Sequence, residues 1–278
     1  MPSNWQFEGY DKMHYTDVLY LFPINPPFVP SDNPTGIYRR EFSIDKNQIK
    51  KSCILSFGGI NSAFDIWING KAAGYGKCSR LSSEYDISSL IEIGNNNITI
   101  RVYKWSDGTY LENQDQWWLS GIYRDVKLIF RAVACIEDVI INTSFKKASS
   151  LGLLDIELAI NNANANYKIK YLLKEKASTS IKEEKSIELN KENKYQINSK
   201  VKNVKKWSAE SPSLYTLELV LEVDNIISDT AVIDFGFREV KIIDNIFKIN
   251  DKEVLLNGIN YHDFSPENGQ SVDYNTVV

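Results

Sequence analysis

The sequence predicts an all-β protein, and three observations support this fold class. Apolar and polar residues alternate at 38–42, 64–68 and 98–102, which is the period of a half-buried strand. Aromatic residues make up 12% of the chain, and their rings suit sheet surfaces. Helical spacing is nearly absent, with a single candidate at 86–91. A length of 278 residues fits two compact domains, and a third only if it is incomplete.

The first predicted domain covers residues 1–130. Asn69-Gly70 separates the strands expected at 64–68 and 72–75, and Asn-Gly suits the two positive φ angles of a tight hairpin turn. Five prolines fall between residues 23 and 34, so this stretch cannot be a central strand. We expect it to form an ordered surface loop.

The second predicted domain covers residues 131–237. Tryptophan and glycine become rare after Arg131, while the alternation persists at 155–158 and 167–171. This pattern favours a smaller β-sandwich whose sheets each expose one face. An alternative is a short helix within the Lys- and Glu-rich stretch 174–194.

The remaining residues, 238–278, are too few to form a core of their own. Apolar segments at 246–249 and 253–256 flank Asn250-Asp251-Lys252, which predicts a hairpin. Either this stretch packs on the second domain, or it opens a further domain that continues past Val278.

Charge and cysteine content exclude several classes of partner. The net charge of −4 provides no basic field for nucleic acid or an anionic bilayer, and no long apolar run predicts a membrane span. Cys53, Cys78 and Cys135 are odd in number and lack CxxC spacing, so neither a disulfide framework nor a thiolate zinc site is expected. Without a secretory leader, the sequence predicts a cytoplasmic protein.

Several catalytic motifs are missing from the sequence, which contains no Gly-x-Ser-x-Gly elbow, P-loop or complete GxGxxG. Segment 105–121 instead gathers three tryptophans, a tyrosine and three acidic residues. Aromatic faces can stack on the C–H face of a sugar, while carboxylates and amides bond its hydroxyls. The segment is therefore a carbohydrate-site candidate. The alternative is a core tryptophan cluster under an acidic turn.

Blocks of residues along the whole chain resemble, in order, the β-galactosidases of glycoside hydrolase family 2, of the enterobacterial LacZ type. These blocks are NSAF at 61–64, SRLSSEYD at 79–86, WSDG at 105–108, QDQW at 114–117, SGIYRDV at 120–126, WSAESPSLY at 207–215, GFREV at 236–240 and LNGINYHD at 256–263. The resemblance implies a jelly-roll, galactose-binding-like domain over 1–130. An immunoglobulin-like β-sandwich over 131–237 and the first strands of a truncated TIM barrel over 238–278 would follow.

The same resemblance implies roles for four residues. Asn61, Asp115 and His262 would contact the sugar, Asp115 would also bind a sodium ion, and Asp107 would lie near a structural magnesium. Carboxylate oxygens suit both ions. Sodium and magnesium are thus expected in the complete enzyme, and neither is expected to be required for this chain to fold.

Catalysis by the family requires two glutamates, of which the acid/base follows an asparagine. The sequence contains no Asn-Glu dipeptide, so we expect both glutamates to lie beyond Val278 and this chain alone to be inactive. Both ends of the chain are expected to be incomplete. The favoured hypothesis is the non-catalytic N-terminal part of a homo-oligomeric β-galactosidase, acting on terminal β-D-galactosides such as lactose. The alternative is a stand-alone carbohydrate-binding or assembly module.

Overall fold

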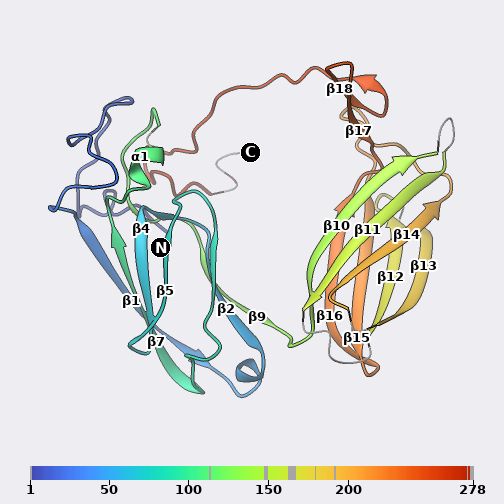
Figure 1. Ribbon diagram of the computed structural model, residues 1–278, viewed down its shortest axis with the longest axis horizontal. Helices are drawn as coiled ribbons and strands as arrows, with labels where there is room; N and C mark the ends of the chain where they lie inside the picture. The colour runs from blue at the N-terminus through green and yellow to red at the C-terminus, as the bar shows by residue number, and fades with distance from the viewer. Residues whose placement is uncertain are drawn as a thin grey trace. The chain divides into compact units, whose positions relative to one another are not determined.

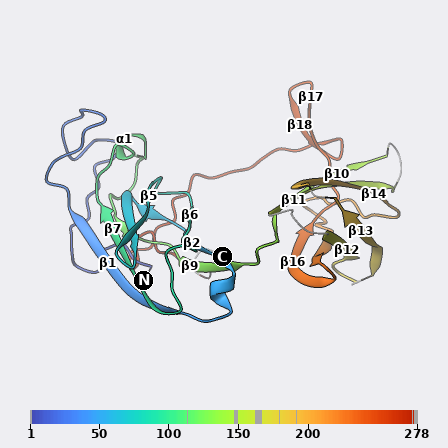
Figure 2. The same ribbon diagram turned by 60° about the horizontal axis from the view of Figure 1, so that its bottom comes forward.

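The computed structural model describes residues 2–112, 114–146, 150–161, 167–178, 180–190, 192–273 and 275. It divides into two compact units, which we call the first unit (Met1–Arg131 with Ile259–Val278) and the second unit (Ala132–Gly258). Both are built almost entirely from antiparallel β-strands (Figures 1 and 2), which confirms the predicted all-β class. No described helix is long and apolar enough to cross a membrane.

The first unit is a sandwich of two main sheets. One has the strand order β1-β7-β4-β5, the other β6-β2-β9, and a short pair joins β3 to β8. The strands are β1 (Thr35–Ile44), β2 (Ser52–Phe57), β3 (Ile60–Asn61), β4 (Ala63–Ile68), β5 (Lys71–Lys77), β6 (Ser83–Asp86), β7 (Gly94–Tyr103), β8 (Gly121–Ile122) and β9 (Val126–Arg131). Alternate residues of both sheets, such as Leu55, Phe57, Phe64 and Ile66, face inward and form one core.

Two predicted local features of this unit are present. Asn69 and Gly70, with φ of +50° and +78°, join β4 to β5, because Ile68 pairs with Lys71. Residues 23–34 contain no strand. Asn33 orders the end of that loop, since its side chain bonds both the N–H and the C=O of Trp105 at 2.9 Å.

The helix candidate at 86–91 is wrong. Asp86 ends β6, and its carboxylate accepts hydrogen bonds from the N–H and the hydroxyl of Ser88, which favours a turn over a helix. Described helical turns lie instead at η1 (Gln48–Lys50), a 3₁₀ turn, and α1 (Thr109–Glu112).

The second unit is also a two-sheet sandwich, with orders β10-β11-β14 and β13-β12-β15-β16. Its strands are β10 (Cys135–Phe145), β11 (Gly152–Asn161), β12 (Tyr167–Glu175), β13 (Ile181–Leu189), β14 (Lys194–Val201), β15 (Tyr215–Val223) and β16 (Ile226–Phe235). Side chains from both sheets, including Ile156, Tyr171 and Leu219, form its core. The helix alternative for 174–194 is wrong, because this stretch spans the end of β12, β13 and the start of β14.

The stretch after the second sandwich begins with a small sheet, β17-β18-β19, formed by β17 (Val240–Ile243), β18 (Ile246–Ile249) and β19 (Lys252–Glu253). The expected hairpin turn is present, and Asn250 and Asp251 adopt φ of +52° and +65°. Its second strand is shorter than expected, because residues 254–264 form no strand.

Candidate functional site

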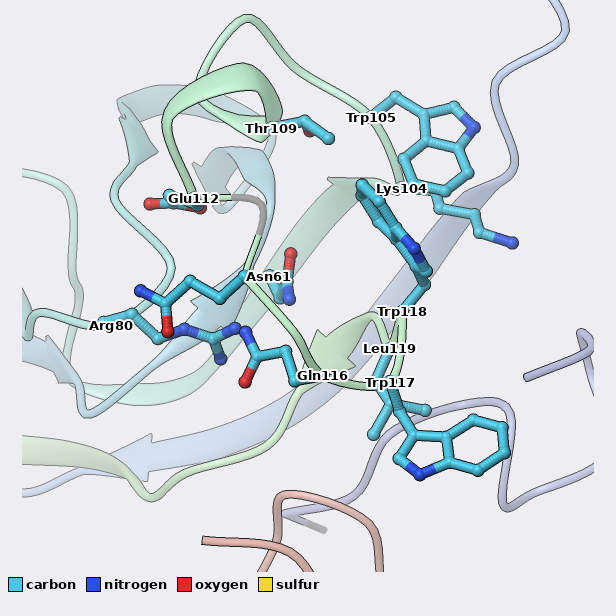
Figure 3. A pocket seen from close by; sticks show the side chains of 11 residues that line it. Asn61, Arg80, Lys104, Trp105, Thr109, Glu112, Gln116, Trp117, Trp118 and Leu119 are labelled. Atoms are coloured by element: carbon cyan, nitrogen blue, oxygen red, sulfur yellow. The ribbon is translucent and has the colours of Figure 1, made fainter. Parts of the chain in front are cut away.

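The first unit contains a small pocket beside the loops that follow its strands (Figure 3). Segment 105–121 supplies most of the wall, and further lining comes from β3 and from the residues after β5 and β7. The wall includes the amides of Asn61, Gln114 and Gln116, the carboxylate of Glu112 and the indoles of three tryptophans. The pocket therefore combines hydrogen-bonding groups with aromatic surface.

A single helical turn places Glu112 on this wall. The Ser106 N–H donates to Thr109 Oγ1, and the Thr109 N–H donates to the Ser106 carbonyl, both at 3.0 Å. This reciprocal pair begins α1, and the Glu112 N–H ends it by donating to the Gly108 carbonyl at 2.9 Å. Glu112 thus projects from a locally fixed backbone.

Glu112 bonds a residue that the sequence did not single out, the fully buried Ser79. The Ser79 N–H donates to Glu112 Oε1 at 2.9 Å, and the Ser79 hydroxyl donates to Oε2. Ser79 Oγ also lies 3.3 Å from Asn61 Oδ1. Asn61 is therefore in the pocket, at the end of β3, and is linked to Glu112 through Ser79.

The tryptophans of the segment differ in exposure. Trp105 is buried and packs edge-to-face on Trp118, with ring centroids 5.4 Å apart. Trp117 is 38% exposed. Its ring stacks on that of Phe264, with centroids 6.1 Å apart and 14° between the ring planes. The ring of Tyr15 is tilted against that of Trp117, with centroids 5.6 Å apart. The segment thus contributes both to the core, as the alternative expected, and to the surface of the pocket.

Asp115 lies at the rim, because its neighbours Gln114 and Gln116 line the pocket while Asp115 itself is exposed. Its Oδ1 accepts a hydrogen bond from the Tyr15 hydroxyl, which raises the pKa of Tyr15. An exposed carboxylate can give an oxygen ligand to a hard cation, so Asp115 fits one position of a sodium site. Its predicted contacts with sugar and sodium stay predictions.

Asp107 lies outside the pocket wall and is paired with Lys77, with Nζ 2.6 Å from Oδ2. This hydrogen bond lowers the pKa of Asp107. Both side chains of this pair are more than 40% exposed, and the magnesium expected near Asp107 stays a prediction. Within the described part of the chain, no three His, Cys, Asp or Glu side chains gather as metal ligands.

His262 is exposed and lies in the strand-free residues 254–264. It is not part of the pocket wall. Phe264, two residues later, stacks on Trp117 and lies 6.3 Å from Phe7, which brings this part of the chain against the pocket's aromatic edge. The structure therefore brings Asn61 into the pocket and Asp115 to its rim, and leaves the sugar contact of His262 a prediction.

Amides, a carboxylate and indoles gathered in one pocket of a β-sandwich suit the binding of a carbohydrate. Comparison with known families agrees. Residues 1–132 match the sugar binding domain of glycosyl hydrolases family 2, 134–238 match a second model named for glycosyl hydrolases family 2, and 240–278 match the family's TIM barrel domain. The chain belongs to glycosyl hydrolase family 2.

Among curated relatives, the β-galactosidase of Pseudoalteromonas haloplanktis is 41% identical over 98% of this chain and 27% of its own length. That of Vibrio vulnificus is 38% identical over 97% of this chain and 27% of its own. This chain thus spans about a quarter of the relatives' length. The solved β-glucuronidase of Bacteroides uniformis shares the fold, with a TM-score of 0.77 at 20% identity over 98% of this chain and 33% of that one.

Proposed function

We propose that this chain supplies the sugar-binding part of an enzyme that hydrolyses terminal β-D-galactosides, such as lactose, by a retaining double displacement. The observation that carries the proposal is the pocket in which Asn61, Glu112 and Trp117 meet. Such a wall matches a sugar, whose hydroxyls need donors and acceptors and whose C–H face packs on rings. The name shared by the relatives, β-galactosidase, supports the choice of sugar.

The two carboxyl groups of the reaction are proposed to come from outside these 278 residues. A retaining glycosidase places them roughly 5–5.5 Å apart, one as acid/base and one as nucleophile. Glu112 is a poor candidate for either role, since both of its oxygens accept hydrogen bonds from Ser79. We assign this chain the task of orienting the galactosyl ring, through Asn61, Asp115 and His262.

A sodium ion at Asp115 is part of the proposal. The ion would neutralise the carboxylate and hold a sugar hydroxyl through its own coordination. Asp115→Asn should therefore weaken the dependence of activity on sodium, and unchanged dependence would remove this assignment. We also propose a structural magnesium near Asp107, which would compete with Lys77 for the carboxylate.

The test of the function is hydrolysis of p-nitrophenyl β-D-galactopyranoside. A polypeptide of the relatives' length should release nitrophenol with retention of configuration, and this chain alone should not. Sugar binding without hydrolysis by the longer polypeptide would favour the stand-alone binding module instead. Turnover by the purified 278-residue chain, made in a host without β-galactosidase, would overturn the assignment of the carboxyl groups.

We further propose a cytoplasmic, homo-oligomeric enzyme. The free thiols of Cys53 and Cys78 support a reducing compartment, and burial raises the pKa of the Cys53 thiol to about 11, which keeps it protonated and inert. Cell fractionation tests the location, and light scattering on the complete enzyme tests the assembly.

A further inference from the structure

The hydrogen bonds around Ser79 explain how one amide of the pocket is held. We propose that Ser79 and Glu112 are positioning residues that fix the side-chain amide of Asn61 for one hydroxyl of the sugar, an inference that rests on the proposed function. The residues are far apart in sequence and meet only in the fold.

Glu112 holds Ser79 by two bonds. One carboxylate oxygen accepts the Ser79 N–H at 2.9 Å and the other accepts the hydroxyl. Bonds to a carboxylate are charge-assisted and stronger than bonds between neutral groups. Because both oxygens bind the same residue, neither the carboxylate nor the serine hydroxyl is free to rotate.

A third bond fixes the backbone of Ser79 from the other side, since the Tyr123 hydroxyl donates to the Ser79 carbonyl. Ser79 has no exposed surface, so water cannot replace these partners. Its N–H, hydroxyl and carbonyl are thus all engaged. Ser79 Oγ is thereby a fixed point beside Asn61 and Glu112, which line the pocket.

The side-chain amide of Asn61 can rotate, and the contact with Ser79 Oγ restricts this rotation. Its backbone is held by the pairing of β3 with β8, where Asn61 lies opposite Gly121. The terminal torsion of an asparagine is broad, and turning it by half a revolution exchanges an acceptor for a donor. The single proton of the Ser79 hydroxyl is shared in a three-centred bond, whose main acceptor is Glu112 and whose weaker acceptor is Asn61 Oδ1, 3.3 Å from Ser79 Oγ. This bond favours the orientation that turns Oδ1 toward Ser79.

The amide's orientation matters for the choice of sugar. Epimers differ only in where a hydroxyl points, so a pocket distinguishes them by placing a donor or an acceptor at a fixed position. An amide that rotates freely satisfies either epimer. Loss of Ser79 or Glu112 should therefore reduce discrimination between sugars as well as the catalytic rate.

The test uses the polypeptide of the relatives' length, which contains the pocket together with the rest of the enzyme. Ser79→Ala and Glu112→Ala should each lower kcat/KM for p-nitrophenyl β-D-galactopyranoside about tenfold. Glu112→Gln keeps an acceptor for the Ser79 N–H and should therefore lower kcat/KM less than Glu112→Ala. The preference for the galactoside over the corresponding glucoside, its 4-epimer, should fall in parallel, which a general loss of stability would not cause.

A double-mutant cycle with Asn61→Ala decides whether the effect passes through Asn61. In that background, Glu112→Ala should cause little further loss. An undiminished loss would overturn the inference and leave the proposed function intact, whereas a wild-type enzyme without galactosidase activity would overturn both. Glu92→Gln, an exposed glutamate of the same unit, is the matched control and should match wild type. Melting temperatures identify variants that fail to fold, and Glu112→Gln then carries the test.

Discussion

The two units use polar side chains in different ways. In the first unit, buried polar residues such as Ser79, Asn96 and Lys104 bond loops and strand ends. In the second unit, charged residues form ladders across neighbouring strands, as in Lys168–Glu188 and Lys174–Glu218. The first arrangement shapes irregular backbone around a pocket, and the second covers regular sheets.

This difference indicates where function lies. Regular strands pair in a fixed register and leave little backbone free, whereas loops on a rigid scaffold can present groups to a ligand. Removing a polar group should therefore lower the free energy of unfolding more in the first unit than in the second. Of the five predictions below, Asp11→Ala in the first unit and Asp234→Ala in the second test this contrast directly.

Asp11→Ala should lower the free energy of unfolding of the first unit by about 3 kcal/mol, the low end for a broken buried pair. Lys104 is 4% exposed, and its Nζ lies 2.5 Å from Asp11 Oδ2, so the substitution leaves a buried charge without its partner. Urea denaturation followed by tryptophan fluorescence measures the loss, because five of the six tryptophans lie in this unit. A loss under about 1 kcal/mol, typical of surface pairs, would contradict the comparison.

The same pair makes a prediction about acid. Burial alone would raise the pKa of Asp11, but hydrogen bonds from Lys104 and the Lys12 N–H bring it below its ordinary value. A carboxyl with a lowered folded pKa stabilises the fold above its unfolded pKa, about 3.9, and this contribution is lost as pH falls through the folded pKa. The free energy of unfolding of Asp11→Asn should therefore fall less steeply than that of the wild type below about pH 4. An equally steep fall in both proteins would contradict this.

Leu219→Ala should lower the free energy of unfolding of the second unit by about 2–5 kcal/mol, through a lost side chain and the cavity it leaves. Leu219 is 1% exposed, in the core shared by both sheets of that unit. The fluorescence of Trp207, the second unit's own tryptophan, measures the loss once the other five are replaced by phenylalanine. A smaller loss than that of a surface variant would mean that the sandwich core is not the source of stability.

Gly152→Ala should lower the free energy of unfolding of the second unit by about 1–3 kcal/mol, because the added methyl group overpacks the core. An added Cβ would lie 2.7 Å from the buried ring of Phe237 and 2.9 Å from Val204. Gly258→Ala is the matched control, because a Cβ there meets nothing within 4 Å. Thermal unfolding should separate the two variants, and equal midpoints would show that the ring can move aside.

The strands could be predicted because their signal is local. Alternation at 64–68 and 167–171 reports which face is buried, and the structure has β4 and β12 there. The turn after Asp86 was missed because periodicity does not show that a side chain will bond the backbone two residues on. Local pattern therefore predicts elements better than it predicts their ends.

The candidate site was predicted less completely, for a related reason. Segment 105–121 stood out by composition, and Asn61 by resemblance. Ser79 bonds Glu112 across 33 positions of sequence, and Lys77 pairs with Asp107 across 30. Such contacts depend on how the loops fold back together, and no spacing rule reports them.

Asp234→Ala should have the smallest effect, under about 1 kcal/mol, although it is the same kind of substitution as Asp11→Ala. Lys176 Nζ lies 2.6 Å from Asp234 Oδ2, but the two side chains are 52% and 40% exposed, so water replaces the lost partner. A double-mutant cycle with Lys176→Ala should give a coupling of about 0.5 kcal/mol that shrinks in added salt. A coupling as large as the loss in Asp11→Ala would show that ion pairs on the sheet faces hold the second unit together, and the contrast between the units would then fail.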